Sequence, residues 1–353
     1  MLPVTNIDLV YVVHRKIIMN HLLESAESET QQQSATLIEG ILVFIAVFMF
    51  SLAAILIKLS ERDLGPNATV FNRFWIATIV LGFWRSIEVL RWRVSKKSVV
   101  PQEKYTLSDL KLLFIAATAT ELCQLAWVWS LTQTGVANAN LLHNFTPVFV
   151  AFGGWLVLGH YFDKRFLIGL ALAIGGAIAI GFEDWQLSTD NLIGDGWALL
   201  SAVFFATNML TTEQLRAKFP ASGILLWSCL IRSCWTFPLV LLTEDKMFPS
   251  SIQGWLTVVS LAVFCQAIAS VILAHQIKKF SSSFISLFLL LEPIFTAVMG
   301  WVIFGEHLSL LNWFAFFVVL LGIYLAQSGE KVEKSTVIEV VNRPILEANI
   351  NEQ

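Results

Sequence analysis

Charged side chains are scarce in this sequence. Asp, Glu, Lys and Arg make up 14% of its 353 residues, whereas hydrophobic residues make up 56%. Soluble globular proteins have about 25% charged residues, so this chain carries too little charge for a water-facing surface of its size. We therefore expect lipid to cover most of it. The net charge of −3 also provides no basic field that would attract nucleic acid.

Signatures of enzymes and of metal sites are missing as well. No Walker A, GxSxG or HExxH pattern occurs. The four cysteines, Cys123, Cys229, Cys234 and Cys265, lie in apolar stretches without metal-ligand spacing, and we expect them to be buried. No catalytic residue, metal or cofactor is predicted, and any transport should be secondary, not ATP-driven.

Apolar segments of membrane-spanning length recur along the chain. A span needs about 20 mostly apolar residues, and the candidate segments are 37–59, 69–90, 110–131, 136–159, 165–183, 194–214, 221–242, 253–277, 281–304 and 309–328. The sequence therefore predicts an all-α polytopic membrane protein of about ten transmembrane helices, with the lipid bilayer as its surroundings.

The distribution of Lys and Arg predicts the orientation, because these residues favour cytoplasmic loops. With both ends inside, the internal loops hold Arg91, Arg93, Lys96, Lys97, Lys104, Lys111, Lys164, Arg165, Arg216, Lys218, Lys278 and Lys279, and the external loops hold only Lys58, Arg62 and Lys246. We therefore assign both termini to the cytoplasm. They are a segment over 1–36, which lacks signal-peptide features and contains an alternative start at Met19, and a charged tail over 329–353.

An internal repeat is the most specific signal in the chain. At one offset of 146 residues, the fourth and ninth predicted spans match at Pro147/Pro293, Phe149/Phe295, Ala151/Ala297, Gly154/Gly300, Trp155/Trp301 and Gly159/Gly305, and the next spans match at Gly176/Gly322. The two copies cover 37–183 and 194–328, each with five spans. Consecutive units with an odd number of spans are inverted in the bilayer, and inverted repeats around a midplane site are typical of transporters.

The motif after each proline resembles that of a known family. Leu291-Glu292-Pro293 with Phe304-Gly305-Glu306, and the first copy's Thr146-Pro147 with Gly159-His160, are similar to the EamA branch of the drug/metabolite transporter superfamily. The first copy departs from the pattern at Thr146 and His160. The resemblance covers about residues 39–328 and implies an inner or plasma membrane permease, often an exporter of amino acids or related metabolites.

Polar residues inside the third predicted span point to a ligand site or to a buried pair. Glu121 and Gln124 lie three residues apart and therefore on one helical face. Charged groups inside a membrane are costly unless they line a cavity or find a partner. Glu121 is interpreted either as a proton- or cation-binding carboxylate or as a structural carboxylate paired with a neighbouring helix.

The fourth predicted span presents Asn140, His143, Asn144 and Pro147 at i, i+3, i+4 and i+7. Proline has no amide hydrogen, so a backbone carbonyl one turn earlier, near His143, should be freed. A polar face next to freed backbone suits a ligand cavity, and hydrogen bonding between helices is the alternative.

Glu292 precedes the proline of the ninth predicted span, where it would bind a substrate amine or a coupling proton, or balance a buried arginine. Arg73 and Arg232 fall at roughly corresponding places in the second and seventh spans. Arg73, nearer the outer end, can reach the headgroups, whereas Arg232 is near mid-span and should have a buried partner. Either guanidinium could instead hold a substrate carboxylate through a bidentate contact.

Three functions are therefore considered. The leading hypothesis is a secondary permease that moves a small-molecule substrate, with Glu121, Gln124, Asn140, His143, Asn144, Arg232 and Glu292 as candidate substrate-binding residues. The alternatives are a non-transporting membrane sensor or scaffold and an intramembrane lipid-modifying enzyme. Small glycines on span faces permit close packing, either within one chain or between two chains of a homodimer.

Overall fold

The computed structural model describes residues 38–53, 55–57, 59–60, 62–94, 105–134, 136–182, 192–304, 310–311 and 313–326. The predicted terminal segments, Met19 and Gly305-Glu306 lie outside this part of the chain. Contacts divide the chain into two units, residues 1–44 and 45–353. The described residues of the first unit, 38–44, are helical.

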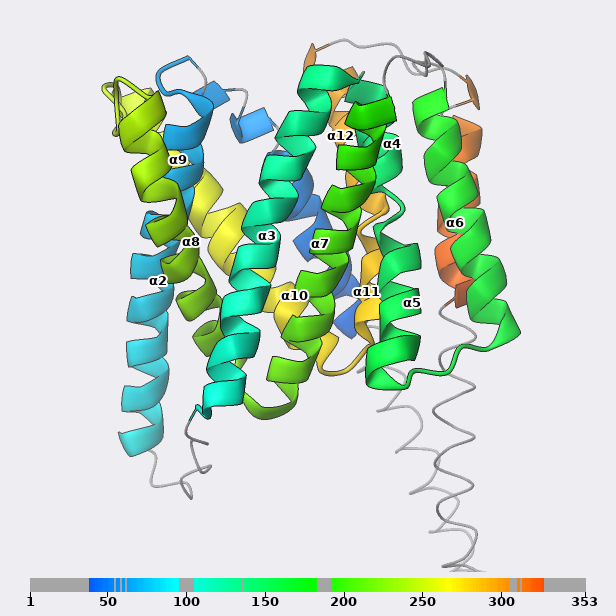
Figure 1. Cartoon of the computed structure of the whole chain (residues 1–353), viewed down its shortest axis with the longest axis horizontal. Helices are drawn as coiled ribbons and strands as arrows, with labels where there is room; N and C mark the ends of the chain where they lie inside the picture. The colour runs from blue at the N-terminus through cyan, green and yellow to red at the C-terminus, as the bar shows by residue number, and fades with distance from the viewer. Residues whose placement is uncertain are drawn as a thin grey trace, which may run out of the picture. The chain divides into compact units, whose positions relative to one another are not determined.

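The described part of the chain contains helices and no strand (Figure 1). After an apolar helix at Ile38–Ile57, the elements are α2 (Pro66–Val94), α3 (Leu107–Gln133), α4 (Val136–His143), α5 (Thr146–Leu158), α6 (Lys164–Phe182), α7 (Leu192–Lys218), α8 (Ala221–Thr243), α9 (Ile252–Ser260), the π-helix η2 (Leu261–Ile268), α10 (Ala269–Ile277), α11 (Ser282–Phe288), α12 (Leu291–Phe304) and a helix at Trp313–Ala326.

Six of the described helices are long and apolar enough to cross a membrane: Ile38–Ile57, Leu107–Ser130, Leu192–Lys218, Ala221–Thr243, Ile252–Ile277 and Ser282–Met299. Two further apolar helices, Thr146–Leu158 and Trp313–Ala326, are shorter. Large hydrophobic side chains remain exposed along these helices, including Leu256 at 65% and Leu242 at 84%. Such exposure fits lipid better than water, so the prediction of an all-helical, multi-pass membrane protein is confirmed.

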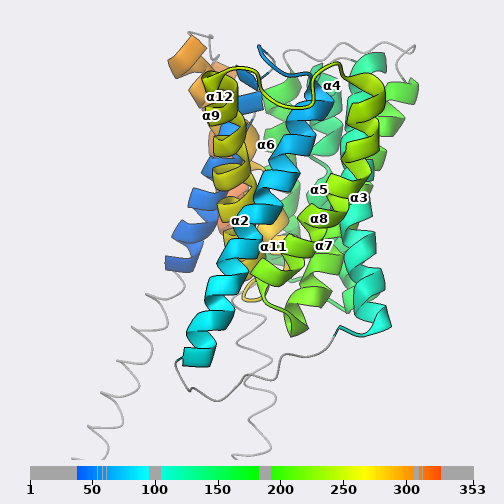
Figure 2. The same ribbon diagram turned by 90° about the vertical axis from the view of Figure 1, so that its left-hand side faces the viewer.

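The packing of α3 against α7 positions the candidate site. The two helices run antiparallel, because the start of α3 meets the end of α7 through an ion pair of 3.1 Å between Asp109 and Lys218. At the other end, the hydroxyl of Thr134 donates a hydrogen bond of 2.8 Å to Asp195. A capping box of Thr106 and Asp109 begins α3. Helix α8 contacts both α2 and α3, and Figures 1 and 2 show the arrangement from two sides.

Two of the predicted spans are interrupted in the middle. Turns separate α4 from α5 and α11 from α12, and in each case a proline stands at the beginning of the second helix. Pro147 cannot donate to the carbonyl of His143, but the hydroxyl of Thr146 donates to it at 2.7 Å. In the other break, the carbonyl of Leu289 accepts from the backbone N–H of Glu292 at 3.0 Å. The predicted free carbonyl near His143 is therefore satisfied.

Helix α6 and the helix Trp313–Ala326 approach backbone to backbone at glycines. A Cβ atom added to Gly169 would lie 2.5 Å from the carbonyl oxygen of Gly322. One added to Gly176 would lie 2.9 Å from the carbonyl oxygen of Ala315. Only glycine allows this approach, which is how small residues bring membrane helices together.

Candidate functional site

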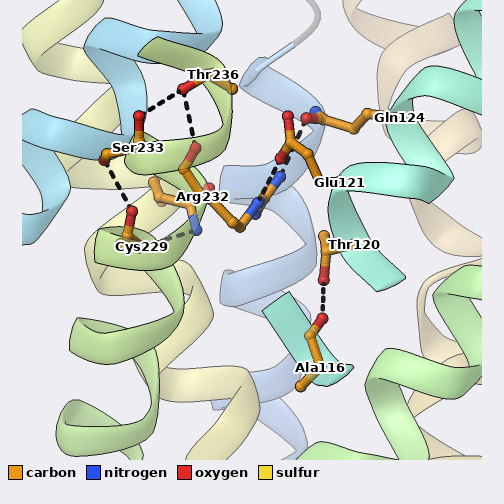
Figure 3. Close-up of polar contacts among 9 residues, drawn as sticks. Ala116, Thr120, Glu121, Gln124, Cys229, Arg232, Ser233 and Thr236 are labelled. Atoms are coloured by element: carbon orange, nitrogen blue, oxygen red, sulfur yellow. Dashed lines mark hydrogen bonds and ion pairs between the residues drawn. The ribbon is translucent and has the colours of Figure 1, made fainter. Parts of the chain in front are cut away.

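A buried ion pair joins α8 to α3. Arg232 donates from Nε to Oε2 of Glu121 and from Nη2 to Oε1 of Gln124, both at 3.1 Å. Figure 3 shows the arginine reaching from α8 to the two acceptors on α3. The guanidinium carbon lies 3.6 Å from the ring centroid of the fully buried Phe74, close enough for a cation–π contact.

The helices position this pair through spacing. Glu121 and Gln124 share a face of α3, as predicted, and this face points toward α8. On α8, the hydroxyl of Thr236 donates to the carbonyl of Arg232 at 2.9 Å, and that of Ser233 donates to the carbonyl of Cys229 at 2.8 Å. Both hydroxyls therefore bond to carbonyls of their own helix, whereas the guanidinium of Arg232 bonds to side chains of α3.

His143 contacts α7 through its ring. Its Nδ1 lies 2.8 Å from Oγ of Ser201, and that hydroxyl donates to the carbonyl of Ala198 at 2.6 Å. Because a serine has a single hydroxyl hydrogen, Nδ1–H of His143 is the donor to Ser201. The neutral ring then presents Nε2 as a hydrogen-bond acceptor.

The predicted polar face of the fourth span is not continuous. The turn at Asn144 and Phe145 ends α4 before Pro147, so the i to i+7 spacing does not describe one helix. Asn140 accepts a hydrogen bond of 3.2 Å from the indole of Trp127 on α3, whereas His143 binds α7. Asn144 is half-buried in the turn itself. The predicted face is therefore interrupted between His143 and Pro147, while Asn140 and His143 remain three residues apart on α4.

Glu292 lies at the first turn of α12 and is half-buried. Its backbone N–H closes the break, as described above, but its carboxylate makes no hydrogen bond or ion pair with any residue that the structure describes. Glu292 lies within electrostatic range of Arg73.

Arg73 is half-buried among several helices. Its Nε is buried and has no hydrogen-bond partner among the described residues. The side chain lies within electrostatic range of Arg232, Cys265, Cys229 and Glu292, which belong to α8, η2 and α12. The sequence offered Arg73 as a possible carboxylate-binding residue, through its rough correspondence to Arg232, but Arg73 is not among the seven residues predicted to bind substrate.

A second polar contact, not anticipated from the sequence, lies at the ends of α5 and α11. Nε2 of His160 is 3.2 Å from Oε1 of Glu213 on α7. The other oxygen of Glu213 accepts from the backbone N–H of Ser282 at 2.9 Å. One carboxylate therefore joins α7 to the end of α5 and to the start of α11.

The cysteines do not contribute to a site. Cys123, Cys229 and Cys265 are buried, as expected, but Cys234 is exposed. Cys234 lines an apolar groove of about 420 Å³ on the face of α3 and α8, together with Phe114, Trp227, Leu230, Ile231 and Trp235. Within the described ranges, no group of three or more His, Cys, Asp or Glu residues could hold a metal ion.

Comparison with protein families gives a match to both copies of the repeat. The sequence profile of the EamA-like transporter family matches residues 37–182 and, separately, residues 192–327. These ranges agree with the two units that the internal repeat delimits.

Individual relatives are distant but match over most of their length. An uncharacterised transporter of Synechocystis sp. is 24% identical, covering 87% of this chain and 96% of that protein. The pseudopaline exporter of Pseudomonas aeruginosa is 21% identical, covering 75% of this chain and 87% of that protein. A solved crystal structure superposes with a TM-score of 0.66 at 14% identity, covering 82% of this chain and 96% of that chain. That similarity concerns the fold.

Proposed function

Because this chain belongs to the EamA-like transporter family, we propose that it is a secondary transporter that moves a small metabolite across the membrane by alternating access. The family and the named relatives identify a membrane transporter. The relative named as an exporter supports export as the direction. Amino acids and related solutes are the first candidate substrates.

One observation carries the mechanism, namely a pair of reciprocal contacts between α6 and the helix Trp313–Ala326. Equivalent positions in the two copies lie 146 residues apart, so Gly169 corresponds to Ala315 and Gly176 to Gly322. Gly169 contacts Gly322, and Gly176 contacts Ala315. Replacing each residue by its equivalent in the other copy turns the first contact into the second, as expected of a two-fold axis. Residue numbers increase along α6 in the direction in which they decrease along the last helix, so these equivalent helices run antiparallel. This arrangement supports inverted repeats.

Other helix contacts follow the same exchange. Helix α2 packs on η2 in the eighth predicted span, and its counterpart α8 packs on α3. Helix α3 packs on α7, and in the exchanged pair Cys265 of η2 donates to the carbonyl of Met49 at 3.0 Å. Helix α5 packs on α7, and the rings of Phe295 and Phe48 meet at 5.6 Å in the exchanged pair. These contacts support ten spans arranged as two inverted five-helix repeats.

Such an architecture provides alternating access when the two copies exchange conformations around a central site. Of the residues predicted from the sequence, we assign substrate binding to Asn140, His143, Asn144 and Glu292. Glu121, Gln124 and Arg232 bind one another between α3 and α8, and we assign them to holding these helices together. Coupling to protons through Glu121, His143 or Glu292 is part of this proposal, because these titratable groups lie within spans. Transport that is independent of an imposed proton gradient would contradict the coupling.

The remaining parts of the proposal concern placement in the cell. The excess of Lys and Arg in one set of loops supports cytoplasmic termini in an inner or plasma membrane. The glycine contact between α6 and the last helix lies within one chain, so a homodimer would have to use other surfaces.

Flux through the purified protein tests the function. The protein is reconstituted in liposomes, and uptake and efflux of a pooled library of amino acids and other metabolites are measured with and without a proton gradient. We expect one class of solute to be moved by the wild type and not by Glu292→Gln. A folded protein that moves no solute under any gradient would favour the sensor or enzyme hypothesis.

A further inference from the structure

The two buried arginines are electrically inequivalent. Arg232 is neutralised by Glu121 at 3.1 Å, and its second nitrogen is bound by Gln124. Arg73 has no such partner, and its Nε is buried without a hydrogen bond in the described part of the protein. Both guanidinium groups lie near the ring of Phe74, at 3.6 Å for Arg232 and 5.9 Å for Arg73. The site therefore contains one guanidinium that two side chains bind and one whose Nε has no hydrogen-bond partner among the described residues.

An unpaired carboxylate belongs to the same surroundings. Glu292 and Arg73 influence each other electrostatically, yet no ion pair joins these two described residues. Both side chains retain accessible surface. An isolated charge inside a membrane protein is costly, and an uncompensated buried charge destabilises a fold by several kcal/mol. A nearby cation and anion that do not touch each other are suited to a ligand that carries both opposite charges.

We propose that Arg73 is the carboxylate subsite and Glu292 the ammonium subsite for a zwitterionic substrate, a small molecule with a free carboxylate and a free amine. This inference rests on the proposed transport function and specifies its substrate class. The planar guanidinium of Arg73 can hold a carboxylate through two hydrogen bonds. Glu292 can accept from the ammonium group, while Arg232 is held by α3 and does not compete for the carboxylate.

The sequence difference between the two copies also explains why only Arg73 should bind the carboxylate of a substrate. On α3, the residues that bind Arg232 are Glu121 and Gln124, and the positions 146 residues later are Ala267 and Ser270. Neither can supply a carboxylate to Arg73. The second copy instead presents Glu292 where the first has Thr146.

A binding experiment on the purified full chain tests the inference. The probes are the common L-amino acids, each beside its carboxamide, its decarboxylated amine and its N-acetyl derivative, and the readout is the shift in melting temperature in detergent. At least one amino acid should bind about tenfold more tightly than each of its three derivatives. Comparable binding of the acid and its amide by the wild type overturns the proposal without any mutant.

Variants assign the two ends of the ligand. Arg73→Gln should abolish the preference for the acid over the amide, and Arg73→Lys should retain part of it. Glu292→Gln should abolish the preference for the free amine over the N-acetyl derivative. An unchanged acid-to-amide ratio in folded Arg73→Gln would falsify the carboxylate subsite.

Parallel flux measurements separate this inference from the proposed function. Flux of a solute that lacks a carboxylate or an amine, with no binding of any amino acid, leaves the transporter intact and rejects the zwitterion site. Selective binding of an amino acid without flux in either direction supports the site and rejects transport. Absence of both rejects both.

Discussion

Arg73 and Arg232 occupy roughly corresponding places in the two copies of the repeat, but their surroundings differ. Arg232 is bound by two side chains of α3, whereas Arg73 is near a carboxylate that it does not contact. A pair of opposite charges that is complete within the protein contributes to structure, and one that is incomplete is available to a ligand. The comparison teaches that a duplicated fold can assign stability to one copy and binding to the other.

The largest effect is expected from breaking the complete pair. Glu121→Leu should destabilise the protein by about 3–5 kcal/mol, because it leaves Arg232 buried without a counter-charge. The double variant Glu121→Leu/Arg232→Leu should recover much of this loss, because no unpaired charge remains. Unfolding in mixed micelles measures both free energies.

Arg73, in the first copy of the repeat, provides the matched control for Arg232 in the second. Arg73→Leu should lower the free energy of unfolding less than Arg232→Leu, because no ion-pair partner of Arg73 among the described residues would be left buried without its counter-charge. Equal losses of unfolding free energy in the two variants would contradict the distinction between a structural and a binding arginine.

The glycine contact provides the next effect. Gly169→Ala should destabilise the protein by about 1–3 kcal/mol, because the new Cβ would meet the backbone of Gly322 and Ala326, which cannot move aside. Gly175→Ala on the same helix is the control, since open space surrounds that position. The control should be neutral or slightly stabilising. Similar stabilities of the two variants would argue against close packing of α6 on the last helix.

The two helix breaks allow a smaller comparison. Thr146→Val should cost about 1 kcal/mol, because the carbonyl of His143 loses its donor. Thr146→Ser keeps the hydroxyl and should be nearly neutral. In the second copy, Glu292→Gln should leave the break unaffected, because the carbonyl of Leu289 accepts from the backbone. The three unfolding free energies, measured together, test whether the breaks are satisfied in different ways.

The smallest effect concerns the loops. Hydrogen bonds from Ser250 and Ser251 lower the pKa of Asp63 from 3.8 to about 2. The folded protein therefore stabilises the ionised carboxylate of Asp63. This contribution to the free energy of unfolding is present above pH 3.8 and is lost as the pH falls through about 2. The difference in melting temperature between wild type and Asp63→Asn should be constant above pH 4 and vanish below pH 2. A difference that grows on acidification would contradict this assignment.

The sequence alone predicts the helices well, because a membrane span requires a continuous apolar stretch that hydropathy detects directly. Pro147 and Pro293 also indicated where two spans would be distorted. Spacing along one helix correctly placed Glu121 and Gln124 on a common face. These predictions succeed because each depends only on residues that are close in the sequence, separated by one helical turn or at most by the length of one span.

Contacts between helices could not be predicted in this way. Glu121 and Arg232 are 111 residues apart, and no local pattern indicates that α8 turns Arg232 toward α3. The surroundings of Arg73 could not be predicted either, because they are residues of α8, η2 and α12 that lie far from it in the sequence. The face predicted to run from Asn140 to Pro147 is not carried by one helix, because the turn at Asn144 and Phe145 separates α4 from α5.

The charges of the central helices have a further consequence for the energetics of transport. Arg73 and Arg232 balance Glu121 and Glu292 when both carboxylates are ionised, so the empty site is neutral and remains neutral with a zwitterion bound. The transmembrane voltage would then do little work on either form as the protein reorients. A proton taken up by Glu292 would give the site a unit positive charge, and moving one charge through the membrane potential is worth about 2.3 kcal/mol per 100 mV. Current recorded during turnover would therefore distinguish an electroneutral cycle from an electrogenic one.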